Sequence, residues 1–253
     1  CIANVRPSGR YTMADFDEAG GVPAVMAAIR HLLHLECRTA TGKTVGENLA
    51  NARIRRPEVI RPIDQPVFKG GLAILNGSLA SSAVVRPTVV PEQMMKHVGP
   101  AHTFDSMESC LEGLEQGKVT AGEVIVLRYE GPRGGPGLTE VFKVLGYMGA
   151  LGLDKTCALV TDGKISGFAK GPFICQVSPE AALGGPIALV QDGDQVAVDI
   201  PGRRLDLLIP AVEIEARRQR WTCPPPRVGH GILGLYARLA EPSERGAGLP
   251  ARI

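Results

Sequence analysis

The sequence predicts a mixed α and β fold whose C-terminal part is rich in strands. After residue 67, short runs of branched apolar residues recur between glycine and proline turns, a pattern typical of strands. Segments with apolar residues at helical spacing lie between these runs. The chain has 253 residues, of which 44% are hydrophobic and 21% charged, so it can form one large or two small globular domains.

Seven runs are predicted to form strands because they are short, rich in branched side chains and bounded by turn residues. They are residues 72–75, 82–85, 123–127, 157–160, 186–190, 195–200 and 205–209. Together with the helices between them, these strands indicate a β-barrel-like domain flanked by helices.

Four segments are predicted to be helical: residues 22–35, 106–116, 139–151 and 211–221. The second has apolar residues at i, i+3, i+4 and i+7, and Gly117 marks its end. In the third, Thr139 is the expected N-cap, which places Glu140 in the first turn, where the helix dipole favours a carboxylate.

The chain is expected to divide near residue 58. Residues 1–58 have mixed α/β character, whereas residues 53–65 are charged, contain Pro57 and Pro62, and lack periodicity. We interpret this charged segment as a linker. The sequence therefore predicts a first domain at residues 1–58 and a second, β-barrel-like domain at residues 59–253.

The composition argues against several classes of protein. A net charge of +2 gives no indication of nucleic-acid binding. No apolar run reaches the roughly 20 residues that cross a membrane, and no secretory signal is visible. The six cysteines form no Cys-x-x-Cys pair, so neither a zinc nor a ferredoxin pattern is present. We interpret them as small buried side chains of a cytoplasmic protein.

Two segments have the chemistry of a functional site. Residues 128–140 (RYEGPRGGPGLTE) form a glycine-rich loop that ends on the carboxylate of Glu140, and residues 161–167 (TDGKISG) hold Ser166 between glycines. Glycine lets the backbone approach a ligand closely. A carboxylate suits a hard cation such as magnesium, beside which a hydroxyl can act as a base. The alternative is two ordinary surface turns, with Asp162 as a turn residue and Glu130 as a loop carboxylate.

Further motifs occur in the order in which a known family has them. They are residues 7–15 (PSGRYTMAD), 20–26 (GGVPAVM), 41–49 (TGKTVGENL), 70–75 (GGLAIL) and 177–186 (VSPEAALGGP), besides the two segments above. On these motifs the chain resembles the C-terminal half of the dihydroxy-acid dehydratase and 6-phosphogluconate dehydratase family, over nearly its whole length.

The resemblance implies a fold, an activity and cofactors. The second domain would be a closed barrel of the swivelling β/β/α kind, and residues 1–58 would be the end of a larger N-terminal α/β domain. Enzymes of the family resembled here dehydrate 2,3-dihydroxy carboxylic acids to 2-keto acids with a magnesium ion and an iron–sulfur cluster. They are commonly homodimers.

Four residues match functional positions of that family. Ser166 matches the serine base that removes the proton next to the carboxylate, and Glu140 matches a magnesium ligand. Lys164 stands where the family often has arginine and, with Gly167, is expected to bind the substrate. The residues by themselves leave three alternatives open: a helix N-terminal carboxylate for Glu140, a turn serine for Ser166 and a solvated loop lysine for Lys164.

The substrate class follows from the same resemblance. Residues 128–137 favour a branched-chain dihydroxy acid. The loop after the serine departs from the family, because Gly167 is followed by Phe168 and no hydroxyl comes next. We expect Phe168 to reshape or fill the pocket. This departure keeps a sugar acid, such as an aldonate or 6-phosphogluconate, as the alternative substrate.

In the family, the cluster cysteines and the other magnesium ligands lie in an N-terminal half whose motifs are not in this sequence. The chain begins with Cys1, inside the family pattern. We therefore expect a C-terminal segment that needs the missing N-terminal half, and no dehydratase activity from the segment alone. A second hypothesis, from a different class, is a stand-alone barrel that serves as a non-catalytic binding or oligomerisation partner.

Overall fold

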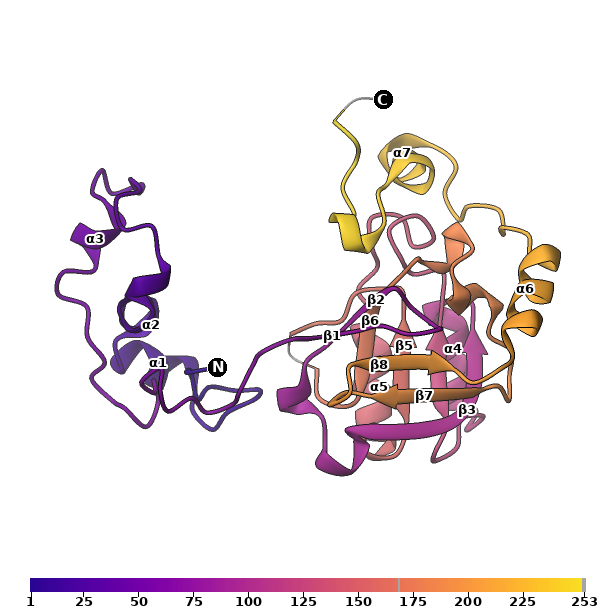
Figure 1. The fold of residues 1–253 in the computed structure, drawn as a ribbon, viewed down its shortest axis with the longest axis horizontal. Coiled ribbons are helices and arrows are strands. Elements are labelled where there is room, and N and C mark those ends of the chain that lie inside the picture. The colour runs from indigo at the N-terminus through magenta and orange to yellow at the C-terminus, as the bar shows by residue number, and fades with distance from the viewer. Residues whose placement is uncertain (168, 252–253) are drawn as a thin grey trace. The chain divides into compact units, whose positions relative to one another are not determined.

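The computed structural model describes residues 1–167 and 169–251 (Figure 1). The chain forms two compact units, Cys1–Gly71 and Leu72–Ile253. The units therefore divide after Gly71, while the sequence-based boundary between residues 58 and 59 remains a prediction. Within the described residues, no helix combines the length and apolar character needed to cross a lipid bilayer.

The first unit is a small helical assembly built from α1 (Met13–Glu18), α2 (Gly21–Ala28) and α3 (Val45–Asn48). Its buried core consists of Phe16, Ala19, Ala24, Val59 and Ile60. The predicted helix at residues 22–35 ends early, at Ala28, and continues only as a 3-10 turn, η1 (Arg30–Leu32). Leu32 is 66% exposed. A further helical turn there would therefore gain no stabilising burial.

The second unit is a nearly closed, barrel-like sheet of eight strands in the order β1-β2-β6-β5-β4-β3-β7-β8. The strands are β1 (Ala73–Leu75), β2 (Ser82–Val85), β3 (Lys96–Phe104), β4 (Val124–Leu127), β5 (Ala158–Thr161), β6 (Phe173–Ser178), β7 (Gln195–Asp199) and β8 (Arg204–Leu207). β3 to β6 pair in parallel, and the remaining pairs are antiparallel. A bridge between Asn76 and Arg204 links the two edges, which confirms the predicted barrel-like, mixed α and β fold.

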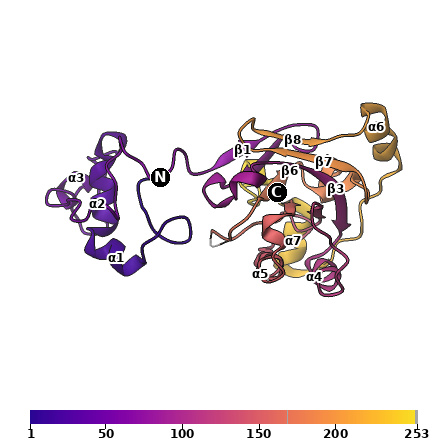
Figure 2. The ribbon, with the colours of Figure 1, turned by 90° about the horizontal axis from the view of Figure 1, so that it is seen from below.

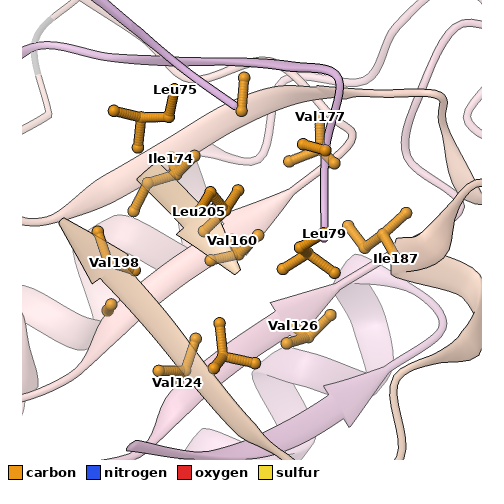
Figure 3. Packing of buried hydrophobic residues seen from close by; sticks show 14 of the residues in the cluster. Leu75, Leu79, Val124, Val126, Val160, Ile174, Val177, Ile187, Val198 and Leu205 are labelled. Atoms are coloured by element: carbon orange, nitrogen blue, oxygen red, sulfur yellow. The ribbon is translucent and has the colours of Figure 1, made fainter. Parts of the chain in front are cut away.

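Strand β4 lies in the part of the sheet that is buried on both faces. All four of its side chains are buried. Val124 and Val126 point into the barrel core, where Figure 3 shows them with Val160 and Leu205. Ile125 and its neighbours on the opposite face pack beneath the helices instead. A continuous apolar run is therefore what a strand between two hydrophobic layers requires.

The outer layer consists of α4 (Met107–Glu115) and α5 (Phe142–Ala150), which lie on one side of the strands (Figure 2). α4 begins at a capping box on Ser106 and ends before Gly117 (φ +66°), as predicted. The predicted helix at 211–221 is confirmed as α6 (Ala211–Arg220). A further helix, α7 (Gly231–Leu239), was not among the predicted segments.

The predicted start of the third helix is wrong. α5 begins at Phe142, Val141 is its N-cap residue, and Thr139 makes no cap. Glu140 lies before the helix, in a one-residue bridge to Lys164. The main-chain N–H of Val141 donates to the carbonyl of Lys164 (3.0 Å), so this residue pairs across strands before the helix begins.

Six of the seven predicted strands are present within about two residues of their predicted bounds. The strand predicted at 186–190 is wrong: its apolar side chains are buried, but they form a 3-10 turn, η6 (Pro186–Leu189), because proline suits the first turn of a helix. Two strands, β3 and β6, were missed. Gly99 and Pro100 argue against a strand. In β3, however, they mark the point where its partner changes from β7 to β4, and a Cβ on Gly99 would lie 2.0 Å from the carbonyl oxygen of Gly122.

Candidate functional site

The two segments singled out in the sequence meet at the bridge between Glu140 and Lys164. The Lys164 N–H donates to the carbonyl of Thr139 (2.8 Å), opposite the Val141 bond described above. The ammonium of Lys164 lies 3.6 Å from a carboxylate oxygen of Glu140, and both side chains are partly exposed. Two predicted site residues, a metal ligand and a substrate-binding cation, are thus placed side by side.

Close packing of the glycine-rich loop fixes this bridge. The Thr139 N–H donates to the carbonyl of Glu130 (3.0 Å), which folds residues 130–139 into a compact turn. Gly163 packs against the base of that turn. A Cβ at Gly163 would lie 2.9 Å from the Cβ of Glu130 and 3.1 Å from the carbonyl oxygen of Thr139. Glycine is therefore required at residue 163 by close approach.

Ser166 follows the bridge by two residues and is half-buried in a turn, where its carbonyl accepts from the Ala169 N–H (3.1 Å). Gly167 is exposed. Phe168, which was expected to reshape the pocket, lies outside the described residues. Arg86, which directly follows β2, was missed by the sequence analysis. Its guanidinium donates to the carbonyl of Gly167 and to that of Ala169 (2.8 Å), so it fixes the backbone that directly follows Ser166.

A cavity of about 240 Å³ adjoins Ser166. Arg86 and Gln176 are its polar side chains besides Ser166, and most of its wall is apolar, with side chains that include Val84, Val89, Ile165, Phe173 and Leu72. Ser166 also borders a second cavity of about 300 Å³ that lies against α5 at Phe142. Ser166 thus lines two small cavities of mainly apolar character.

Three buried carboxyl groups, those of Asp162, Glu130 and Glu180, fix the glycine-rich loop and its neighbours through hydrogen bonds. Asp162, interpreted from the sequence only as a turn residue, is fully buried. It accepts the N–H groups of Tyr129 (3.1 Å), Glu130 (2.9 Å) and Ala181 (2.9 Å), which ties three separate loops together. Burial raises its pKa to about 6, although these hydrogen bonds act in the opposite direction.

The other two buried carboxyl groups, those of Glu130 and Glu180, hold the first half of the turn. Glu130 is fully buried, accepts the Met107 N–H at the start of α4 (2.7 Å) and pairs with Arg227 (3.0 Å). Glu180, which the sequence analysis missed, accepts the N–H of Arg133 (3.1 Å). Burial raises the pKa of Glu180 to about 7, and the neighbouring charge of Asp162 adds to the effect.

These raised pKa values predict that the barrel unit is more stable in mild acid. A folded-state pKa above the unfolded value means that the folded chain binds protons more tightly, so this stabilisation is complete below about pH 4 and is lost as the pH rises through 6 to 7. We expect the free energy of unfolding to fall by about 4 kcal/mol between pH 5 and pH 8, from both carboxyl groups together. Urea unfolding followed at Trp221, the only tryptophan in the chain, measures it.

The matched variants for this experiment are Glu180→Gln and Glu112→Gln. Glu180→Gln removes a buried titrating group and should weaken the pH dependence of the free energy of unfolding. Glu112 is exposed on α4, so Glu112→Gln should leave that pH dependence unchanged. The carboxyl groups of Asp192 and Asp199, whose pKa values are lowered, titrate below this window. A free energy of unfolding that rises between pH 5 and 8 would contradict the prediction.

The described residues do not by themselves fit a metal centre. Among them no group of three or more histidine, cysteine or acidic side chains is arranged to hold a metal ion. Glu140 is one carboxylate, and magnesium requires a set of oxygen ligands. Cys110 and Cys175 are buried with pKa values raised to about 12 and about 11, which disfavours the thiolate that an iron–sulfur cluster needs.

Comparisons with known proteins cover both units. Residues 58–247 match the family model described as dihydroxy-acid/6-phosphogluconate dehydratase C-terminal, and residues 1–48 match its N-terminal counterpart. The chain is 46% identical over 250 residues to a dihydroxy-acid dehydratase of Acetivibrio thermocellus, which covers 97% of this chain and 45% of that protein. It is 48% identical over 252 residues to a dihydroxy-acid dehydratase of Ignicoccus hospitalis, and this match covers 98% of the present chain and 46% of that protein. The chain thus spans less than half the length of these curated relatives.

Proposed function

Because the chain belongs to the dihydroxy-acid/6-phosphogluconate dehydratase family, we propose that it is the C-terminal region of a hydro-lyase that converts a 2,3-dihydroxy carboxylic acid to a 2-keto acid. One observation supports this most directly: the family match includes the bridge that pairs Glu140 with Lys164, two residues before Ser166. The relatives named dihydroxy-acid dehydratase support the reaction class.

We assign the proton transfer to Ser166. The proton next to a carboxylate is a weak acid, so its removal needs a positioned base and a way to stabilise the charge that develops. A serine hydroxyl is itself a weak acid and becomes a base only beside positive charge. We propose that Lys164, two residues away along the chain and ion-paired with Glu140 (3.6 Å), contributes this charge and binds the substrate carboxylate. Gly167 offers its exposed backbone to the substrate.

Enzymes of this family generally depend on a metal ion and an iron–sulfur cluster. We propose that Glu140 supplies one magnesium ligand and that the other ligands, together with the cluster, come from the missing N-terminal half. Exposed apolar side chains in the first unit support an additional partner surface: Met13, Val22 and Leu32 are 60% to 66% exposed. We also propose, from the family resemblance, that the complete enzyme is a homodimer.

For the substrate we propose a branched-chain dihydroxy acid. The cavity beside Ser166 supports it, because its wall at Val84, Val89 and Phe173 is apolar and suits an alkyl branch. A polyol chain would leave its hydroxyl groups without partners on such a wall. If the complete enzyme instead has the higher kcat/KM for an aldonate or 6-phosphogluconate, the sugar-acid alternative holds.

The 253-residue chain is predicted to have no dehydratase activity by itself, because its described residues contain no group of three or more acidic, histidine or cysteine side chains that could hold a metal ion. The measurement is an anaerobic assay of 2-keto acid formed from a branched 2,3-dihydroxy acid, with the isolated chain and with the complete enzyme compared at equal concentration. We expect turnover from the complete enzyme alone. Robust turnover by the isolated chain would contradict the proposed division of ligands, and no turnover by the complete enzyme would favour a non-catalytic barrel.

A further inference from the structure

A second concave site lies on the barrel unit, lined by residues that are distinct from those of the Ser166 cavities. It has a volume of about 450 Å³. Its lining combines three arginines, Arg133, Arg227 and Arg238, with apolar residues that include Pro224, Pro225, Pro226 and Ala237. The phenol ring of Tyr129 also borders it. This volume is in the range of small-molecule sites.

The charges around this cavity do not balance. Arg227 is paired with the buried Glu130 (3.0 Å), and Asp105, the acidic residue of the lining, is paired with Arg128. Arg133 donates through Nε only to the carbonyl of Ala240 (2.9 Å). No ion pair of the described residues involves Arg133 or Arg238.

A buried carboxyl group lies beside one of these two guanidinium groups but forms no ion pair with it. Glu180 is the carboxyl group beside Arg133, but it accepts from the main-chain N–H and not from the guanidinium. Arg238 is exposed on α7. Two guanidinium groups, at Arg133 and Arg238, therefore face a concave surface without a carboxylate partner among the described residues. Guanidinium groups recognise carboxylate and phosphate oxygens through paired N–H donors.

We propose that this cavity, the Arg133–Arg238 site, binds a small dianion whose charges are carried by a phosphate group or by two carboxylates. The two unpaired guanidinium groups match the two negative charges. The proline and alanine side chains of the lining accommodate a short carbon skeleton. The lining shares no residue with the two cavities beside Ser166, although Tyr129, Arg133 and Gly134 belong to the same glycine-rich loop that ends on Glu140.

The chain contains a built-in reporter for this site. Trp221 is the only tryptophan, and its indole N–H donates to the hydroxyl of Tyr129 (3.2 Å), which borders the cavity. Titration of the 253-residue chain with inorganic phosphate, and separately with succinate, at constant ionic strength should give a saturable change in tryptophan fluorescence. The two titrations distinguish a phosphate ligand from a dicarboxylate.

The variants Arg238→Gln and Arg220→Gln test the assignment. Arg238→Gln should raise the Kd at least about tenfold, because it removes a charged donor pair. Arg220 also lies near Trp221 but lines a different cavity, so Arg220→Gln should bind as the parent chain does. Equal Kd values for Arg238→Gln and the parent chain would overturn the proposal, as would an identical fluorescence change with sodium chloride at the same ionic strength.

Discussion

Replacement of Ser166 by alanine is expected to lower kcat of the complete enzyme about 10³-fold while the barrel stays folded, since a positioned general base contributes on the order of 10²- to 10⁴-fold to a rate. Ser166 is half-buried and lines cavities rather than the core, so the loss of one hydroxyl leaves the packing intact. Steady-state kinetics with a branched 2,3-dihydroxy acid gives kcat and KM separately. KM should change little, because the base acts in the transition state.

The matched control is Ser81→Ala. Ser81 is an exposed serine between β1 and β2 whose hydroxyl donates to the carbonyl of Ser178 (3.0 Å). Its removal should leave kcat within about threefold of the parent value. If Ser166→Ala keeps the parent rate, Ser166 is not the base. If both variants lose activity equally, the effect comes from the fold and not from the reaction.

Replacement of Asp162 by alanine is expected to destabilise the barrel unit by about 3 kcal/mol or more. The carboxylate satisfies the N–H groups of Tyr129, Glu130 and Ala181 in a fully buried place. Alanine would leave all three without an acceptor, and each such group costs about 1–3 kcal/mol. The relief of burying a charged group offsets part of this loss. Urea unfolding at neutral pH, followed at Trp221 in the same unit, measures the difference.

For Asp162→Ala the control is Glu112→Ala, which removes an exposed carboxylate from α4 and should change the free energy of unfolding by less than about 0.5 kcal/mol. The loss of unfolding free energy for Asp162→Asn should lie between those of Asp162→Ala and Glu112→Ala, because an amide offers one acceptor oxygen where the carboxylate offers two. A loss below about 1 kcal/mol for Asp162→Ala would contradict the view that this residue ties three loops together.

Local sequence patterns predicted those elements whose burial follows a simple rule. Strands such as β4 are apolar throughout because both faces are covered. The start of α4 is marked by its N-cap residue Ser106 and its end by Gly117. β3 was missed because Gly99 and Pro100, which look like a turn, serve a change of partner between β7 and β4. That change depends on residues far away along the chain, which no local pattern contains.

The candidate site shows the same division. Glu140 and Lys164 were predicted as site residues from their motifs, but the helix expected at Thr139 gave way to pairing across strands. Arg86 was missed because a single arginine after a strand carries no local signal, although it binds the serine loop 81 residues away. Asp162 was underestimated because burial, which determines its hydrogen bonds and its raised pKa, is a property of the fold.

The bridge between Glu140 and Lys164 also bears on how the site would be inherited and engineered. Because the two chain segments are joined through main-chain hydrogen bonds on both sides of Lys164, neither can shift along the other without breaking them. A loop graft that carried only residues 128–140, or only residues 161–167, would therefore lack the main-chain hydrogen-bond partners that fix its conformation. We expect the two segments to be transferable between barrels only as a pair.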